Sequence, residues 1–113
     1  MAESLERGAL TEAVYYILLS LYKPMHGYGI MQNIKELSNG RVALGAGTMY
    51  GAINTLLEKG WINPVAMEEK SRKKEYQITK MGKEVIKLEV LRLKELIKNG
   101  NDIAGGDCNE SCD

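Results

Sequence analysis

The sequence predicts a mainly α protein with one small β-hairpin, an α+β fold, and three observations support this prediction. Apolar residues recur at helical spacing in four segments, which Gly, Pro and Asn turn signals separate. The third segment ends at Gly60 and passes directly into two short β-prone runs that flank a polar turn. No apolar run reaches the roughly 20 residues that a membrane-spanning helix requires. We therefore expect a single helical domain with a hairpin after its third helix, and no membrane partner.

The first helix is expected to follow Thr11, whose side chain can cap it. It should end at Lys23, because the residue before a proline avoids the helical region. Its residues are apolar nearly all round, and a helix without a polar face must be covered on both sides. The sequence therefore predicts that this helix packs against more than one neighbour.

The second helix is predicted for about residues 26–38, and Asn39 and Gly40 form the turn signal that stops it. Residues 41–44 are interpreted as a short edge strand, and residues 45–47 as a loose connection. The stripe of the helix that faces the core consists of Ile30, Ile34 and Leu37.

The third helix should begin near Thr48 and end at Gly60, which suits a C-terminal cap. Residues 61–67 and 72–78 are predicted as the two antiparallel strands of the hairpin, with residues 68–71 as the turn. Helical spacing turns four residues toward the core: Met49, Ile53, Leu56 and Leu57. The outward positions are Thr48, Tyr50, Gly51, Asn54, Thr55 and Glu58.

Thr79 is expected to cap a long fourth helix that ends near Lys98. Glu89 and Arg92 lie inside its apolar band, where they are expected to pair with each other or across an interface. Residues 99–101 should close the helix, and the acidic remainder is expected to be disordered. The band is wider than a single core contact needs, and it comprises Met81 at its margin with Val85, Ile86, Leu88, Val90, Leu93, Leu96 and Ile97.

A helix that is followed at once by a basic hairpin suits duplex DNA, because the major groove admits a helix while the hairpin grips phosphates beside it. The chain has no net charge, but residues 1–98 carry 15 basic against 11 acidic groups. We therefore expect a winged helix-turn-helix DNA-binding domain over residues 1–79. A C-terminal dimerisation helix over residues 80–98 and a disordered acidic tail over residues 99–113 should follow it.

Candidate DNA contacts on the third helix begin with Thr48 and Tyr50. The N–H groups and the dipole at the start of a helix favour a phosphate. The alternative role for Tyr50 is packing against the hairpin. Asn54 lies one turn further on, where it can pair with adenine in the major groove or remain a solvated residue. Gly51 and Thr55 would allow the helix to approach DNA closely.

The hairpin supplies the densest positive cluster of the chain. Its candidate phosphate contacts position the protein without reading sequence. Arg72 and Lys74 should share one face of a strand and Lys73 the other. Lys35 on the second helix is a weaker candidate for the same role. The full set on the hairpin is Ser71, Arg72, Lys73 and Lys74.

The first and fourth helices together expose more apolar surface than 98 residues can cover. Contiguous patches of that size usually mark an interface. A two-fold dimer would double the local positive field and would select a palindromic operator in double-stranded DNA. The candidate dimer contacts are Val14, Leu18, Leu21, Ile86, Val90, Leu93 and Ile97.

The sequence contains no phosphate loop, no paired carboxylates in an apolar setting and no zinc motif. His26 is the one histidine, and we expect it to start the second helix and to hydrogen-bond locally. Cys108 and Cys112 cannot by themselves complete a four-ligand zinc shell, so an inert reduced pair is expected, with a redox or metal role as the alternative. We predict a protein that is not an enzyme and needs no cofactor. Its first residues lack the pattern of a secretory signal, which predicts a cytoplasmic location.

Five motifs that follow one another in order resemble the PadR-like family of transcriptional regulators, in its short subgroup. They are LT-x-x-x-x-x-IL (residues 10–18), HGY (26–28), GTMY (47–50), L-x-x-GWI (57–62) and KKEYQIT-x-x-G (73–82). The resemblance covers about residues 9–98. It implies a winged helix-turn-helix repressor that forms a homodimer through its first and last helices and reads DNA with the helix of the GT-x-Y motif.

The resemblance also implies release of repression by a small hydrophobic or phenolic effector, or by a cationic drug, in some members. One position departs from the family, because Gly51 stands where proline often follows the motif tyrosine. Two other classes of function stay open at this point. One is a winged helix that assembles with proteins instead of regulating DNA, and the other is a carrier that binds a ligand in the dimer pore.

Overall fold

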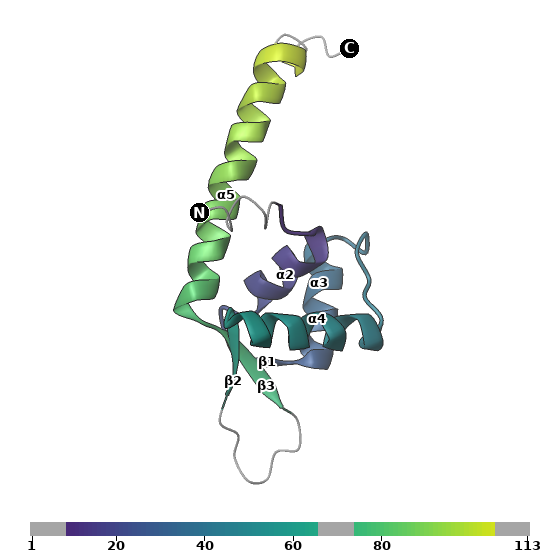
Figure 1. Ribbon diagram of the computed structural model, residues 1–113. Helices are drawn as coiled ribbons and strands as arrows, with labels where there is room; N and C mark the ends of the chain where they lie inside the picture. The colour runs from purple at the N-terminus through teal and green to yellow at the C-terminus, as the bar shows by residue number, and fades with distance from the viewer. Residues whose placement is uncertain (1–8, 66–73, 106–113) are drawn as a thin grey trace.

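The computed structural model describes residues 9–65 and 74–105. Figure 1 shows α2, α3 and α4 packed into one body, with the strands at one end and α5 running along the side and past the body at the other. This arrangement confirms the predicted mainly α class with a small β element. The elements in chain order are α2 (Glu12–Ser20), β1 (Met25–His26), α3 (Gly27–Leu37), α4 (Ala46–Lys59), β2 (Ile62–Val65), β3 (Glu75–Ile78), α5 (Lys80–Gly100) and a π-helical turn η1 (Asn101–Gly105).

Side chains cap three of the helices. The Val14 N–H donates to Thr11 Oγ1 over 3.1 Å at the start of α2, and the Gly82 N–H donates to Thr79 Oγ1 over 3.0 Å at the start of α5. His26 precedes α3, and its Nδ1 accepts the Gly29 N–H over 3.1 Å. The predicted roles of these two threonines and of the histidine are therefore confirmed.

The end of α2 and the start of α4 differ from the prediction. The helix α2 ends at Ser20, before Lys23, because the following residue turns away and donates its N–H back to carbonyls of the last turn. The helix α4 begins at Ala46 with Gly45 as its N-cap. Residues 46 and 47 therefore belong to the helix, and interpreting them as a loose connection was wrong.

The sheet has three antiparallel strands in the order β1-β3-β2. The predicted edge strand at residues 41–44 is wrong, since the structure has no strand there. The Val42 N–H is instead bound by Ser38 Oγ over 2.9 Å. The third strand is β1, in which Met25 pairs with Tyr76 across the ladder. This strand has only two residues and lies between a proline and a helix. The sequence therefore shows no alternating pattern from which the strand could be predicted.

The core lies where α2, α3, α4 and the sheet meet. The prediction was correct for two of the three residues of the α3 stripe, but Leu37 is 48% exposed because it sits at the last position of the helix. The predicted core residues of α4 are buried apart from Leu57, which is partly exposed. Within the described ranges, the hydrophobic side chains with no exposed surface are those of Ile17, Leu18, Leu21, Ile30, Ile34, Met49, Ile53 and Ile62.

On α5, the predicted pairing of Glu89 with Arg92 within one chain is confirmed. Arg92 Nε donates to Glu89 Oε1 over 3.0 Å, and its Nη2 lies 2.6 Å from Glu89 Oε2. The Leu10 N–H donates to the same carboxylate over 3.2 Å, which ties the segment before α2 to α5. The helix also passes through residues 99–101, which were expected to close it, and continues into η1.

We expect Glu89→Gln to lower the free energy of unfolding by about 1–3 kcal/mol at neutral pH, because the amide cannot form charge-assisted bonds with Arg92. These bonds hold the pKa of Glu89 below its ordinary value of 4.5. A lowered carboxyl pKa stabilises the native state at neutral pH, and this stabilisation is lost as the pH falls through the native pKa. The difference between wild type and variant in urea unfolding should therefore shrink below pH 4.5. An equal difference at pH 7 and at about pH 3 would contradict this role.

Candidate nucleic-acid interface

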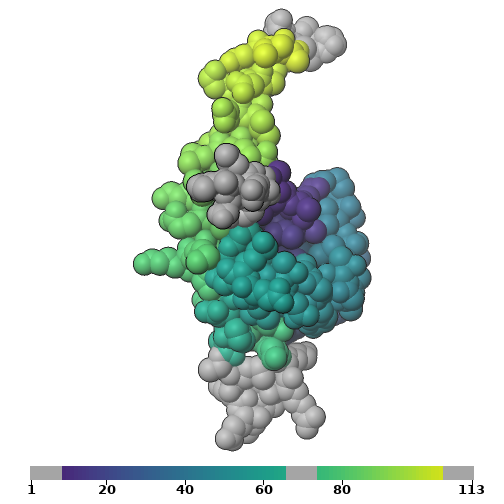
Figure 2. Space-filling model, viewed as in Figure 1, coloured from purple at the N-terminus to yellow at the C-terminus, as the bar shows by residue number. Residues whose placement is uncertain are grey.

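The outward face of α4 is the first part of the candidate interface. Met49, Ile53 and Leu56 anchor the opposite face in the core, which leaves the predicted contact residues of α4 exposed. Figure 2 shows α4, in teal, as a broad surface across the body. All five predicted positions are therefore on the surface: Thr48, Tyr50, Gly51, Asn54 and Thr55.

Gly51 lies near the middle of this face. A Cβ atom built on it would meet nothing within 4 Å. The helix begins at Ala46, so Gly51 belongs to its second turn and does not form the start of the helix. The glycine therefore leaves a stretch of bare backbone between Tyr50 and Asn54, where another molecule can come close.

Tyr50 is held by the first turn of α3. A Cβ atom on the buried Gly27 would overlap the Tyr50 hydroxyl and would lie 2.6 Å from Tyr50 Cζ and 2.9 Å from Met49 Cε. The glycine is therefore what lets the ring lie against α3. Burial raises the pKa of Tyr76 on β3, and the neighbouring Tyr50 raises it further. Tyr50 thus lies against the first turn of α3, while 45% of its surface stays exposed.

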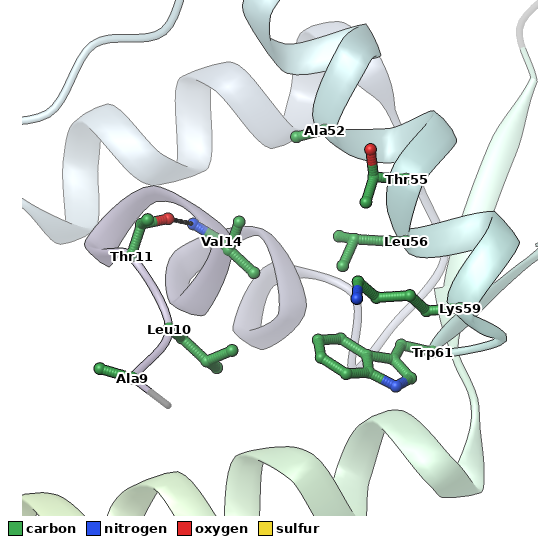
Figure 3. Close-up of a pocket in the computed structure, with 9 residues that line it drawn as sticks. All are labelled: Ala9, Leu10, Thr11, Val14, Ala52, Thr55, Leu56, Lys59 and Trp61. Atoms are coloured by element: carbon green, nitrogen blue, oxygen red, sulfur yellow. Dashed lines mark hydrogen bonds between the residues drawn. The ribbon is translucent and has the colours of Figure 1, made fainter. Parts of the chain in front are cut away.

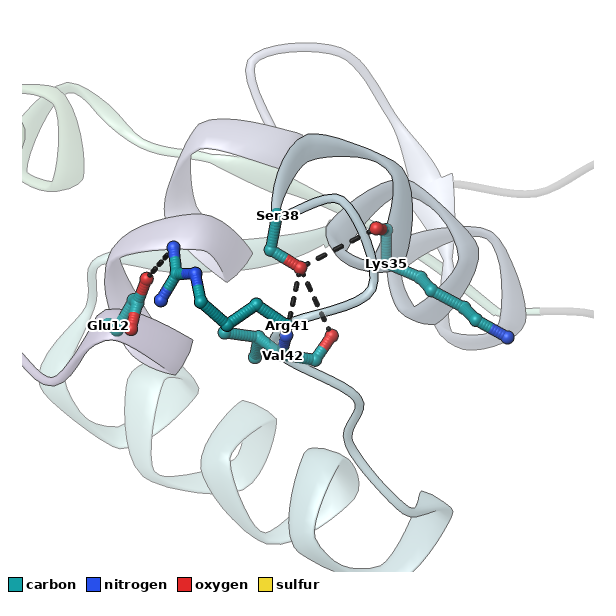
Figure 4. Close-up of polar contacts among 5 residues, drawn as sticks. All are labelled: Glu12, Lys35, Ser38, Arg41 and Val42. Carbon is teal, nitrogen blue, oxygen red and sulfur yellow. Dashed lines mark hydrogen bonds and ion pairs between the residues drawn. The ribbon is translucent and has the colours of Figure 1, made fainter.

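The loop between α3 and α4 is fixed by polar contacts (Figure 4). Ser38 is buried, and besides accepting the Val42 N–H its hydroxyl lies 3.3 Å from the Val42 carbonyl oxygen. Arg41 pairs with Glu12 of α2 at 2.5 Å, and this hydrogen bond lowers the pKa of Glu12. The loop is therefore attached to both α3 and α2. Lys35, one turn before the loop, is exposed as the prediction requires.

The hairpin carries the second part of the candidate interface. Of its predicted residues, Ser71, Arg72 and Lys73 lie outside the described residues, and Lys74 is exposed next to the start of β3. The strands pair from Ile62 opposite Ile78 onward. The structure thus brings Lys74 to the end of the ladder that is farther from α5.

A compact junction joins α4, β2 and α5. Gly60 ends α4 in the left-handed conformation at φ 77°, which favours glycine. The Thr79 hydroxyl donates to the Gly60 carbonyl over 2.7 Å, and the Thr79 N–H donates to the Trp61 carbonyl over 2.9 Å. Gly82 packs so closely that a Cβ atom would overlap the Trp61 carbonyl oxygen. The start of α5 is therefore locked to the end of α4, a coupling that sequence reasoning missed.

A pocket of about 290 Å³ lies beside this junction, between the start of α2 and the second half of α4. Figure 3 shows its walls. We call it the Trp61 pocket, after the residue that closes one side. Its principal walls are Leu10, Val14, Thr55, Leu56, Lys59 and Trp61.

The predicted dimer residues fall into two groups. Leu18 and Leu21 have no exposed surface within a single chain, and Ile86 is also buried. Val14, Val90 and Leu93 are partly exposed, and Ile97 is 62% exposed. The predicted dimer contacts omit Leu91 and Leu96, although both are exposed apolar residues of α5 and Leu96 belongs to the predicted apolar band.

Neither a metal site nor a membrane helix is found in the described ranges. Residues 9–65 and 74–105 contain no group of three or more His, Cys, Asp or Glu side chains that could hold a metal ion. None of the helices in the same ranges combines the length and the apolar character needed to cross a membrane. Cys108 and Cys112 lie outside the described residues.

Comparisons with known proteins point to one family. The model of the transcriptional regulator PadR-like family matches residues 16–88. An uncharacterized 37.1 kDa protein in transposon TN4556 of Streptomyces fradiae is 36% identical over 73 residues, or 65% of this chain, and the match spans only 20% of that protein. A PadR family transcription regulator from Clostridium difficile R20291 is 25% identical with a TM-score of 0.70, over 82% of this chain and 98% of that one. Bacillus subtilis PadR in complex with operator DNA is 26% identical with a TM-score of 0.55, over 67% and 45%.

Proposed function

The chain belongs to the PadR-like family of transcriptional regulators, and from this premise we propose that it is a homodimeric repressor that binds a palindromic operator. This is a family of DNA-binding regulators, so the chain is a regulator and not an enzyme. The relative from Bacillus subtilis was solved on operator DNA, which supports duplex DNA as the partner here. A DNA partner also favours the cytoplasm as the place of action.

The observation that carries the proposal is the pairing of an exposed helix face with a basic strand end. Thr48, Asn54 and the bare backbone at Gly51 form one exposed face of α4. Such a face fits the major groove, where Asn can pair with adenine. Lys74 and Lys35 are exposed cations on neighbouring elements, and cations of this kind neutralise phosphates. We propose that Ser71, Arg72 and Lys73 extend the same phosphate contact.

The second copy is proposed to cover the far half of α5. The stripe of α5 that is buried in the body contains Val85, Ile86 and Glu89. Helical periodicity continues this stripe through Leu93, Leu96 and Ile97, where α5 has passed the body (Figure 1). The apolar residues on that part of α5 can be buried only by another molecule. The proposed interface therefore consists of Val14 and Val90 at its edge with Leu93, Leu96 and Ile97, while Leu18, Leu21 and Ile86 stay in the core of each copy.

Repression and its release complete the proposal. A dimer that occupies an operator blocks transcription by excluding other proteins from the same DNA. We propose that a small hydrophobic or phenolic effector releases the operator by changing how the two α4 helices are held.

Lys74→Ala should lower the salt dependence of DNA binding. Each phosphate contact that is lost reduces the slope of log K against log[salt] by roughly 0.9. A dimer loses two such contacts, so the slope should fall by about 1.8 per dimer. Fluorescence anisotropy with duplex from the chain's own upstream region, measured over a range of salt, gives the slope.

Lys87→Ala is the matched control, because it removes one exposed lysine from α5 and should leave the slope unchanged. An unchanged slope for Lys74→Ala would remove Lys74 from the interface. If the wild-type chain binds no duplex from that region even at low salt, the DNA-binding proposal fails and assembly with a protein becomes the better account.

Gly27→Ala should weaken DNA binding while the fold survives. Tyr50 is half-exposed and can swing away from the new methyl group, and alanine is preferred over glycine in helices by about 1 kcal/mol. We therefore expect a change in stability below about 1 kcal/mol and a loss of DNA affinity of about tenfold, or ~1.4 kcal/mol. Thermal unfolding and anisotropy measure the two effects.

The double variant Gly27→Ala/Tyr50→Ala separates the two roles of the tyrosine. Tyr50→Ala removes the overlap with the tyrosine ring and leaves only the flexible end of Met49, whose Cε would lie 2.9 Å from the new methyl group, so adding Gly27→Ala to it should cost no further DNA affinity. If the single variant Gly27→Ala binds DNA as tightly as wild type, the packing of Tyr50 against α3 does not contribute to DNA affinity.

A further inference from the structure

We propose that Gly51 selects part of the operator sequence, because it leaves room on α4 for the 5-methyl group of one thymine. This inference rests on the proposed function, since it requires α4 to lie in the major groove. It goes further by naming a base and the position of the chain that selects it. Gly51 stands where the family often has proline, so the selection would be a property of this chain rather than of the whole family.

Gly51 lies on the side of α4 that faces away from the core. Met49, Ile53 and Leu56 are the buried residues of this helix. Steps of about 100° per residue place Gly51 and Asn54 on the opposite side, and both are exposed. A helix in the major groove turns the middle of its outward face toward the base edges. Gly51 would therefore meet bases and not phosphates.

The missing side chain at Gly51 leaves a gap on this face, which we call the Gly51 gap. A Cβ atom built there would meet nothing within 4 Å, so no distant part of the described chain fills it. On one side of the gap is Tyr50, whose ring packs against Gly27 of α3. On the other side is Thr55, whose hydroxyl turns back and donates to the Gly51 carbonyl over 3.2 Å. The gap is therefore held open between two residues that have contacts of their own.

The chemistry of the Gly51 gap favours thymine over the other bases. In the major groove guanine and adenine present the N7 acceptor, cytosine presents an amino donor, and thymine alone presents a methyl group. Glycine offers no side-chain donor, and its carbonyl already accepts the Thr55 hydroxyl. A polar base edge placed here would lose water without gaining a partner, whereas a methyl group would gain apolar cover. Thymine therefore fits the gap best.

Asn54 fixes where this thymine lies relative to a second base. An asparagine amide can form paired hydrogen bonds with N6 and N7 of adenine. A helix rises about 1.5 Å per residue, so Asn54 lies about 4.5 Å further along α4 than Gly51. The step between base pairs is about 3.4 Å. We therefore expect the thymine and the adenine within about two base pairs of each other in each half-site.

Replacing thymine by uracil removes the 5-methyl group and leaves the hydrogen-bonding edge intact, so it tests the inference directly. Duplexes from the chain's own upstream region would carry uracil in place of one thymine at a time, and fluorescence anisotropy would give the affinity of each. We expect one thymine in each half-site at which wild type binds about fourfold more weakly, as expected for one buried methyl group. Uracil at the other thymines should leave the affinity unchanged.

Gly51→Ala supplies a methyl group from the protein and fills the Gly51 gap. The variant should bind the thymine duplex about tenfold more weakly and should recover affinity when that one thymine becomes uracil. Alanine is a better helix former than glycine, so circular dichroism should show an intact fold. Gly100→Ala is the matched control, because a Cβ atom there also meets nothing within 4 Å but lies on α5. It should respond to uracil like wild type.

Asn54→Ala tests the neighbouring adenine. Substitution by 7-deazaadenine removes the N7 acceptor, and wild type should lose about tenfold in affinity at one adenine within two base pairs of the selected thymine. Asn54→Ala should show no loss at that adenine. A loss in Asn54→Ala as large as in wild type would overturn the placement of α4 on which the inference depends.

The outcomes separate this inference from the proposed function. If wild type binds the duplex but responds to uracil at no thymine, the inference fails and DNA binding stands. The inference also fails if Gly51→Ala loses as much affinity with uracil as with thymine, or if it binds the thymine duplex more tightly than wild type. If wild type binds no duplex from that region at low salt, the proposed function fails and the selection of thymine fails with it.

Discussion

Ile97→Glu should convert the protein to a monomer and lower its apparent affinity for the operator by on the order of 100-fold. Ile97 is 62% exposed in a single chain, so a glutamate there costs the isolated protomer little. In the proposed dimer the same carboxylate would be buried against apolar residues of the second copy, at a high desolvation cost. A monomer loses the gain from linked half-sites, which is typically 10²–10⁴-fold. Sedimentation velocity gives the mass and anisotropy gives the affinity.

Leu91→Glu is the matched control, because Leu91 is on the same helix and is 56% exposed. Helical periodicity places it on the side of α5 opposite the stripe of Leu93, Leu96 and Ile97. This variant should remain dimeric and should bind the operator like wild type. If Leu91→Glu dissociates the dimer and Ile97→Glu does not, the interface lies on the other side of α5.

Gly82→Ala should destabilise the protein by at least about 2 kcal/mol, as expected for overpacking in a region that cannot relax. The new methyl group would overlap the Trp61 carbonyl oxygen and lie 2.6 Å from Ile78 Cγ1. The Trp61 backbone is held by the Thr79 N–H and cannot move without breaking the junction between α4 and α5. Urea denaturation at neutral pH measures the loss.

Gly100→Ala is the corresponding control on the same helix. A Cβ atom at Gly100 would meet nothing within 4 Å, and alanine is the better helix former by about 1 kcal/mol. This variant should be as stable as wild type or slightly more so. Equal stability of Gly82→Ala and wild type would show that the junction tolerates a shift of α5, and the coupling of α5 to α4 would then lose its basis.

Residues whose environment is set by their own helix were predicted well. The spacing of Ile30 with Ile34 and of Met49 with Ile53 predicted their burial, and none of the four has exposed surface. The outward face of α4 followed from the same period. Periodicity fails at helix ends, as Leu37 shows, because it is the last residue of α3 and is 48% exposed although Ile34 and Ser38 on either side of it are buried.

Segments whose structure depends on distant partners were predicted poorly. Met25 and His26 become a strand only because Tyr76 and Glu75 lie opposite them. Residues 41–44 were interpreted as an edge strand, yet Ser38 binds the Val42 backbone and replaces any ladder. A side chain that competes for the backbone in this way changes the local outcome.

The end of α5 shows that a turn signal in the sequence does not always end a helix. Asn and Gly each disfavour a helix by no more than about 1 kcal/mol, which is too little to end α5 against its own preceding turns. An ion pair between Lys98 and Asp102 at 2.7 Å spans the predicted break. The helical conformation therefore continues through residue 105.

The sequence was enough to locate the candidate interface, but it did not predict the contacts that hold the interface residues in place. The exposed positions of α4 and the basic hairpin follow from period and composition. The packing of Tyr50 against Gly27 depends on how α3 crosses α4. The Trp61 pocket depends on how α2 packs against α4 and the start of β2. Both are contacts between residues that are far apart in the chain, and no local pattern indicates them.

The most direct test of paired binding is a hydroxyl-radical footprint of the chain on duplex from its own upstream region. Two copies related by a two-fold axis should protect two half-sites on one face of the duplex, with centres about one helical turn, or roughly 10 base pairs, or a multiple apart. Ile97→Glu should lose both protected regions at the same protein concentration. A single protected region of one half-site, unchanged by Ile97→Glu, would contradict the account of a dimer that reads DNA with two α4 helices.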